Sequence, residues 1–190
     1  MANGITWYPG IGADEEIAKL ERLVGKITAY WAQVEDELFT IFTFAVAGTW
    51  TIGDLEPYRA VFFTFSSYEG KMRMVNNAMN ARFRSDEGAL TKWKALRKSM
   101  NDFSALRNEI AHLIPRPKYS LDPAATAVVR LVPPFWKPTE GEIEFEKRGY
   151  SWDELTHAIA PFWGYDPSLN IRDASQPKLI ARLDDFRKKL

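Results

Sequence analysis

A short run of residues near the middle of the chain combines side chains that can act on a phosphate group. Residues 106–112 read Leu-Arg-Asn-Glu-Ile-Ala-His. Arg107 carries a permanently charged guanidinium whose paired donors match phosphate oxygens, and the imidazole of His112 is the side chain that titrates near neutrality. Asn108 could orient the histidine or donate to the phosphate. These residue types suit acid–base chemistry beside a bound phosphate.

The pattern around this run predicts a helix that ends soon after it. Apolar residues recur three and four positions apart, at Met100, Phe103, Leu106, Ile110 and Leu113. This spacing is typical of one buried helix face. Asn108 and His112 are four residues apart, so they share the opposite face. Pro115 and Pro117 then stop the helix.

The arginine, the polar residue directly after it and the histidine five positions after the arginine resemble the Arg-x4-6-His signature of HEPN domains. That family places its motif late in the third long helix of an antiparallel bundle, and the resemblance covers residues 13–114. It implies a metal-independent endoribonuclease in which Arg107, Asn108 and His112 are catalytic, in a toxin–antitoxin or phage-defence setting. It also implies a homodimer whose two motifs line one cleft around RNA, with an antitoxin or a nucleotidyltransferase as a further partner.

Two other functions fit the same residues. A non-catalytic HEPN-like module would dimerise and bind nucleotide, RNA or a partner protein. A purely structural protein would use its aromatic surfaces to recruit another chain. In that case His112 would only stabilise the negative end of its helix, and Arg107 would pair with an acid such as Glu109.

The composition excludes several other classes. The chain has no cysteine and only two isolated histidines, so disulfides and thiolate metal sites are excluded and a zinc site is not expected. It has no Gly-rich phosphate loop, no G-x-S-x-G and no H-E-x-x-H. We therefore expect no metal and no cofactor. No apolar run reaches the roughly 18 residues of a spanning helix and no signal peptide is visible, which favours a cytoplasmic protein with no membrane association.

Charge is distributed unevenly along a chain whose net charge is zero. Residues 1–70 carry four basic and ten acidic side chains, whereas residues 71–118 carry eleven basic and four acidic ones. The basic excess therefore coincides with the segment that holds the motif. The residues expected to attract RNA, besides Arg107, are Lys92, Lys94, Arg97, Lys98, Arg116 and Lys118. The alternative is a solvated helix face that compensates the acidic first helix.

Three long helices are predicted before the prolines. Apolar stripes predict one from Asp14 to Gly48, one from Asp54 to Met79 with a bend near Gly70, and one capped by Ser85 that runs through the motif. Their short connections imply antiparallel neighbours in a bundle.

The rest of the chain predicts smaller elements. Residues 115–141 hold six of the eleven prolines, and Ala127–Val132 and Glu142–Lys147 are read as the strands of a β-hairpin. Ser151 to Glu154 form a capping box that starts a helix ending near Trp163, with His157 inside it as a partly buried or surface histidine. Gln176–Leu190 predicts a final amphipathic helix.

The predicted fold is therefore all-α, an antiparallel helical bundle of HEPN type with a small β-hairpin insertion and C-terminal helices. We expect a single domain over residues 1–190, with the bundle core at 13–114, the loop and hairpin insertion at 115–150 and the C-terminal helices at 151–190. The arm of residues 1–12 contains Trp7 and Tyr8, which are too apolar to remain fully in solvent, so the arm should pack against the body or a partner.

Overall fold

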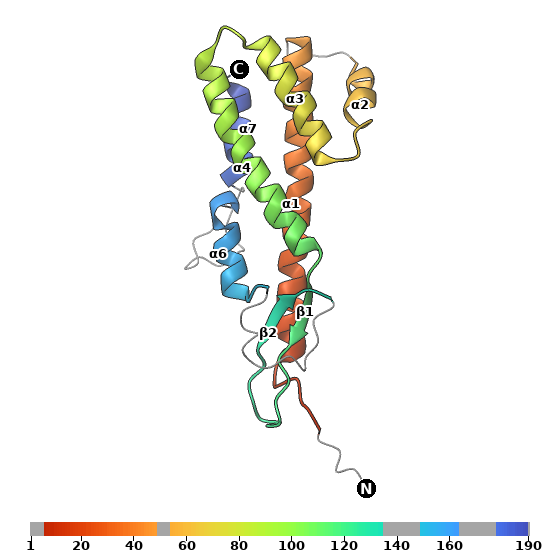
Figure 1. Ribbon diagram of the computed structural model, residues 1–190, viewed down its shortest axis with the longest axis vertical. Helices are drawn as coiled ribbons and strands as arrows, with labels where there is room; N and C mark the ends of the chain where they lie inside the picture. The colour runs from red at the N-terminus through yellow and green to blue at the C-terminus, as the bar shows by residue number, and fades with distance from the viewer. Residues whose placement is uncertain (1–5, 49–53, 135–148, 164–177, 190) are drawn as a thin grey trace. The chain divides into compact units, whose positions relative to one another are not determined.

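The computed structural model describes residues 6–48, 54–134, 149–163 and 178–189. These residues are mainly helical, with one small antiparallel sheet (Figure 1). The elements are α1 (Ala13–Ala47), α2 (Glu56–Phe62), α3 (Tyr68–Arg82), α4 (Glu87–Ala111), β1 (Ile114–Pro117), β2 (Val129–Val132), α6 (Trp152–Trp163) and α7 (Lys178–Lys188). The helical class with a small two-stranded sheet is thereby confirmed. None of the helices in these ranges is long and apolar enough to cross a membrane.

The chain divides into two compact units. The first comprises Met1–Thr28 and Leu106–Ile159, and the second comprises Ala29–Ala105 and Ala160–Leu190. The first unit therefore contains the motif, the sheet and the N-terminal arm. The second contains α2, α3, α7 and the greater part of α1 and α4.

In the second unit, α1 and α3 run parallel, which differs from the antiparallel arrangement expected of consecutive long helices. Trp31 contacts Tyr68 edge to face, with ring centroids 4.8 Å apart, and Phe44 stacks on Phe83 just after α3, at 6.2 Å. The contacts thus advance in the same direction along both helices. After α1 the chain runs back through α2 before α3 begins. The ring of Phe62 in α2 packs on the ring of Phe39 in α1, with centroids 5.3 Å apart.

This return explains why the second predicted helix is two helices. The stretch from Asp54 to Met79 has a continuous apolar periodicity, but it breaks after Phe62, and a new helix begins at Tyr68. Ser67 caps this helix by accepting a hydrogen bond from the Gly70 amide at 3.2 Å. The predicted bend is therefore a helix boundary, because the serine side chain replaces the intrahelical partner of that amide.

Consecutive helices α3 and α4 are antiparallel as expected, and they lie side by side (Figure 1). Asn76 of α3 accepts hydrogen bonds from Trp93 at 3.1 Å and from Arg97 at 2.6 Å. The cap of α4 was predicted one residue too early. Asp86, and not Ser85, accepts a hydrogen bond from the Ala89 amide at 2.9 Å.

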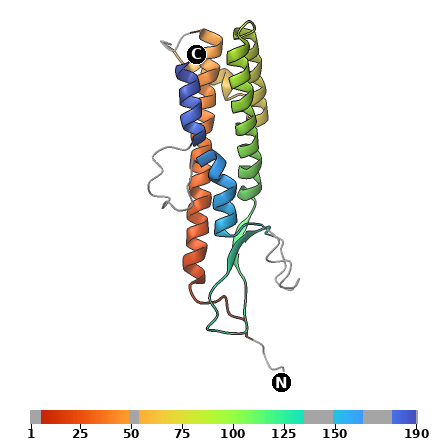
Figure 2. The same ribbon diagram turned by 90° about the vertical axis from the view of Figure 1, so that its left-hand side faces the viewer.

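The final helix confirms its predicted amphipathic character over Lys178–Lys188, and the rest of the predicted range lies outside the described residues. Figure 2 shows α7 alongside α1. Nη1 of Arg187 in α7 lies 3.9 Å from Oε2 of Glu37 in α1. Phe186 also stacks on Trp93 of α4, with ring centroids 6.2 Å apart. Both rings are buried, so α7 completes the apolar core of the second unit.

In the first unit, the sheet uses a strand that the sequence analysis missed. Val129–Val132 is extended as predicted, but it pairs with Ile114–Pro117, in a register that places Ile114 opposite Val132. The predicted partner, Glu142–Lys147, lies outside the described residues. Pro115 and Pro117 lack amide donors, so the sequence predicts only the end of a helix at these positions. An edge strand tolerates them because one of its two sides forms no hydrogen bonds to a neighbouring strand.

Residues 8–11 of the N-terminal arm pack back on the body as predicted, although Trp7 remains 57% exposed. Tyr8 and Ser120 exchange two backbone hydrogen bonds of 2.8 Å, and Ile11 donates to Ala125 at 2.8 Å. Gly10 makes this path possible because its φ is +86° and a Cβ there would lie 2.7 Å from the Ala127 backbone.

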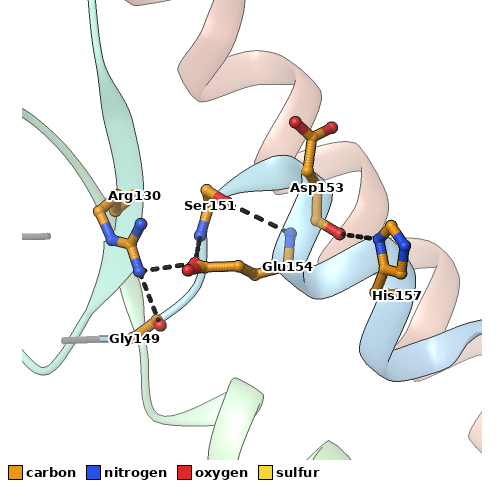
Figure 3. Close-up of polar contacts among 6 residues, drawn as sticks. All are labelled: Arg130, Gly149, Ser151, Asp153, Glu154 and His157. Atoms are coloured by element: carbon orange, nitrogen blue, oxygen red, sulfur yellow. Dashed lines mark hydrogen bonds and ion pairs between the residues drawn. The ribbon is translucent and has the colours of Figure 1, made fainter. Parts of the chain in front are cut away.

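The capping box of α6 connects this helix to β2 (Figure 3). The Ser151 amide donates to the Glu154 carboxylate at 2.8 Å, and the Glu154 amide donates back to the Ser151 hydroxyl at 3.2 Å. Arg130 of β2 donates to the same carboxylate at 2.6 Å and to the Gly149 carbonyl at 3.1 Å. The amide of Ser151 and the guanidinium of Arg130 therefore lower the pKa of Glu154 despite its partial desolvation.

Replacing Glu154→Gln should make stability less dependent on pH. A folded-state pKa below the ordinary value means that the ionised carboxylate stabilises the fold at neutral pH, by about 1 kcal/mol for this half-exposed group. The difference in the free energy of unfolding between Glu154→Gln and wild type should be complete above about pH 5. It should shrink as the pH falls from about 4.3, the ordinary pKa of Glu, through the folded-state pKa. Urea unfolding between pH 7 and pH 3 measures it. The control Glu69→Gln removes an exposed pair with Arg73 and should show no such trend; a constant difference for Glu154→Gln would contradict this account.

Replacing Gly10→Ala should detach the arm. The new Cβ would lie 2.7 Å from the Ala127 backbone, and alanine would have to adopt the unfavourable φ of +86°. Gly12→Ala is the matched control, since its φ is +83° but no atom lies within 4 Å of its Cβ position. We expect the free energy of unfolding to fall by about 1 kcal/mol for Gly12→Ala and by at least about 2 kcal/mol for Gly10→Ala. Urea titration measures both values, and equal losses would show that the close approach is unimportant.

Candidate functional site

The last turns of α4 present the motif as the apolar periodicity predicted. Ile110 is 1% exposed, and Met100 and Phe103 on the same stripe are buried. Asn108 and His112, on the opposite side, are exposed. Burial of the apolar stripe therefore sets the rotation of the helix and turns the two polar side chains toward solvent.

The guanidinium of Arg107 contacts the amide of Asn108. Its Nη1 donates to Oδ1 of Asn108 at 3.0 Å, whereas its Nε is buried and has no hydrogen-bond partner among the described residues. The half-buried Arg107 is thus hydrogen-bonded to the exposed amide of its neighbour Asn108. A buried donor without a partner costs about 1–3 kcal/mol.

His112 lies in the turn directly after α4. Its amide donates to the Glu109 carbonyl at 3.2 Å, and the Leu113 amide donates to the Ile110 carbonyl at 3.0 Å. These short-range bonds close the last turn of the helix before β1 begins at Ile114. The imidazole is therefore carried by a backbone that is fixed on both sides, by the helix and by the sheet.

Tyr150 contributes a contact to the motif that the sequence gave no reason to expect. Its side chain hydrogen-bonds with that of Glu109, and its backbone pairs with Leu131 through bonds of 2.8 and 3.0 Å. Burial, followed by the hydrogen bond and the charge of Glu109, raises the pKa of Tyr150. The tyrosine is 41 positions from Glu109, and no local periodicity relates them.

The six predicted RNA-binding cations fall into the two units. Arg116, exposed on β1, and Lys118 belong to the unit that holds the motif. The remaining four belong to the second unit: Lys92, Lys94, Arg97 and Lys98. Arg97 donates to Asn76, and Lys98 pairs with Asp102 at 2.7 Å. Of the six, Arg116 and Lys118 therefore belong to the same unit as the motif.

The second histidine has a local structural role. His157 is exposed on α6, and its Nδ1 lies 3.0 Å from the carbonyl oxygen of Asp153, one turn earlier in the helix (Figure 3). In the described parts of the chain, no group of three or more His, Asp and Glu side chains could hold a metal ion. The chemistry that these residues offer is thus that of a cation, an amide and an imidazole at one helix end.

Comparison of the chain with protein-family models, with curated proteins and with solved structures finds no match. The function is therefore inferred from the residues and their geometry, together with the resemblance of the short motif.

Replacing Tyr150→Phe should destabilise the first unit, because it removes a hydrogen bond to an ionised acceptor while leaving the ring in place. We expect a loss of about 1 kcal/mol in the free energy of unfolding. Tyr119→Phe, at an exposed tyrosine of the same unit, is the control and should change stability by less than about 0.5 kcal/mol. Urea unfolding of the three proteins measures both effects, and equal stability for Tyr150→Phe and wild type would remove the proposed role of the tyrosine.

Proposed function

We propose that the protein is a metal-independent endoribonuclease that acts through Arg107, Asn108 and His112. The observation that carries the proposal is the placement of an exposed imidazole and an exposed amide on one side of a helix end, with the Arg107 guanidinium hydrogen-bonded to that amide. A cation and an acid–base group are the parts that RNA cleavage by the neighbouring 2′-hydroxyl needs.

The reaction assigns a step to each side chain. A neutral imidazole accepts the proton of the 2′-hydroxyl while its oxygen forms a bond to the adjacent phosphorus. The guanidinium donates to the non-bridging oxygens, whose charge increases in the pentavalent transition state. The bond to the 5′-oxygen then breaks, and this oxygen receives a proton from an imidazolium. The products are a 2′,3′-cyclic phosphate and a free 5′-hydroxyl.

This scheme needs two imidazoles, and each chain supplies one at the motif. We therefore include a homodimer in the proposal, with His112 of one chain as base and His112 of the second copy as acid. Asn108 positions the guanidinium, since its Oδ1 accepts from Nη1 at 3.0 Å. Such a site predicts a rate that falls at both low and high pH, because one imidazole must be neutral and the other charged.

The test is cleavage of single-stranded RNA in excess EDTA by wild type and by His112→Ala, Arg107→Ala and His157→Ala. We expect His112→Ala and Arg107→Ala to lose at least about 100-fold in rate, the usual contribution of an acid–base group. His157→Ala is the matched control because it removes the other exposed histidine, and it should cleave at the wild-type rate. Circular dichroism and urea unfolding check that each variant is folded.

Several results would contradict the proposal. Wild-type protein that leaves RNA intact in EDTA would exclude the nuclease. Affinity for RNA without cleavage, falling with salt, would instead support a binding module. Equal activity of His112→Ala and His157→Ala would assign the cleavage to other residues or to a contaminant.

A further inference from the structure

The contact between α1 and α7 in the second unit buries one oxygen of a carboxylate. Oε2 of Glu37 is buried and has no hydrogen-bond partner among the described residues, and the side chain as a whole is only 20% exposed. The cation that faces it is Arg187 of α7, whose Nη1 lies 3.9 Å away, beyond hydrogen-bonding distance. An ionised carboxylate at this contact therefore loses solvation without gaining a hydrogen bond from the cation in return.

Arg187 is held by a second carboxylate, which belongs to its own helix. Its Nη2 donates to Oδ1 of Asp184, and Oδ2 of Asp184 lies 2.6 Å from Nζ of Lys188. These contacts lower the pKa of Asp184, chiefly through the hydrogen bond from Lys188. Asp184 is therefore ionised at neutral pH, and its negative charge lies close to Glu37.

The surroundings of Glu37 favour its neutral form. The charged groups that act on it are Arg187 and Asp184 of α7 and Asp36 of its own helix, and no charged side chain of another described helix is among them. Desolvation raises the pKa of Glu37, and the negative charges of Asp184 and Asp36 add to this effect, whereas Arg187 opposes it. The two neighbouring carboxyl groups are thus shifted in opposite directions.

The helix that makes this contact also covers the apolar core of the second unit. Leu183 and Phe186 of α7 are buried, and Phe186 stacks on Trp93 of α4. Asp184 and Arg187 alternate with these two apolar residues within one turn of the helix. A change in the free energy of the charged contact therefore changes how firmly the apolar face of α7 is held.

We propose that α7 docks on α1 with uptake of a proton by Glu37, so that acidification strengthens the contact between the two helices. At neutral pH the ionised carboxylate opposes docking, and the buried apolar side chains hold the helix in place. The proposal is independent of the ribonuclease, because both helices contribute these residues to the second unit and the motif belongs to the first.

The direction of the pH dependence follows from the raised folded-state pKa. The stability that protonation of Glu37 gives is fully present below about pH 4.3, the ordinary pKa of Glu, and is lost as the pH rises through the folded-state pKa. Asp184 acts in the opposite sense, because its ion pairs weaken only as the pH falls below about 3.9, the ordinary pKa of Asp. The effect of Glu37 is therefore measured between pH 7.5 and about pH 4.5, above the range in which Asp184 titrates.

The side-chain carboxyl carbon of Glu37 reports its protonation directly. In ¹³C NMR of the full chain, with Glu37→Gln to assign the signal, the midpoint of its titration should lie above about pH 4.3. Asp184→Asn removes the facing charge and releases Arg187 to pair with Glu37, so in this variant the midpoint should move to lower pH. A wild-type midpoint at or below the ordinary value would overturn the proposal, and so would an unchanged midpoint in Asp184→Asn.

Hydrogen exchange measured by mass spectrometry tests whether this proton strengthens docking. Protection of the amides of residues 178–188, relative to an unstructured chain at the same pH, should be at least about threefold higher at pH 4.5 than at pH 7.5. Glu37→Gln carries no charge at either pH, so its protection should be nearly equal at both and should exceed that of wild type at pH 7.5. Asp36→Asn, at the exposed neighbouring acid, is the matched control and should keep most of the wild-type ratio.

Two exchange results would contradict the proposal. The same ratio of protection in Glu37→Gln and in wild type would show that other groups cause the pH dependence. An equal rise of protection in residues 87–105 of α4 would show that acid stabilises the whole second unit and not the docking of α7.

Discussion

Burial of Ile110 is the interaction on which the candidate site depends. This side chain is 1% exposed, and with Phe103 it fixes the rotation of the last turns of α4. Because a helix has about 3.6 residues per turn, fixing one face determines the other. Asn108 and His112 are exposed for that reason. The guanidinium of the half-buried Arg107 donates a hydrogen bond to the side-chain amide oxygen of Asn108. The exposure of these polar side chains thus follows from the packing of the buried stripe beneath them.

The surrounding elements of the first unit hold that helix end in place. The chain passes from His112 directly into β1, whose two prolines suit an edge position. Register places Arg116 opposite Arg130, a pairing of like charges that is unfavourable in isolation. Glu154 offsets it, because its carboxylate accepts from Arg130 while it also caps α6. Tyr150 adds a side-chain hydrogen bond to Glu109 within the motif.

Periodicity and caps predicted the elements whose signals are local. The stripe from Met100 to Leu113 and the capping box of Ser151 needed only neighbouring residues. Met100, Phe103 and Ile110 of the stripe are buried, and the capping box forms. The break after Phe62 was missed because the apolar spacing continues through it. The strand Ile114–Pro117 was missed because its prolines cannot donate to the hydrogen bonds of a β-ladder. Long-range partners such as Tyr150 with Glu109, or Tyr8 with Ser120, depend on tertiary pairing that no local pattern encodes. The bundle of HEPN type, the dimer and the RNA target remain predictions.

The most direct test of the central claim is the chemical identity of the RNA ends that the purified protein produces in chelator. Mass spectrometry of a defined single-stranded RNA should show 2′,3′-cyclic phosphates and 5′-hydroxyls, as attack by the 2′-hydroxyl requires. The same oligonucleotide with 2′-O-methyl groups throughout should remain intact. Ends with 5′-phosphate and 3′-hydroxyl groups, or cleavage of the methylated strand, would contradict the assigned roles of Arg107 and His112.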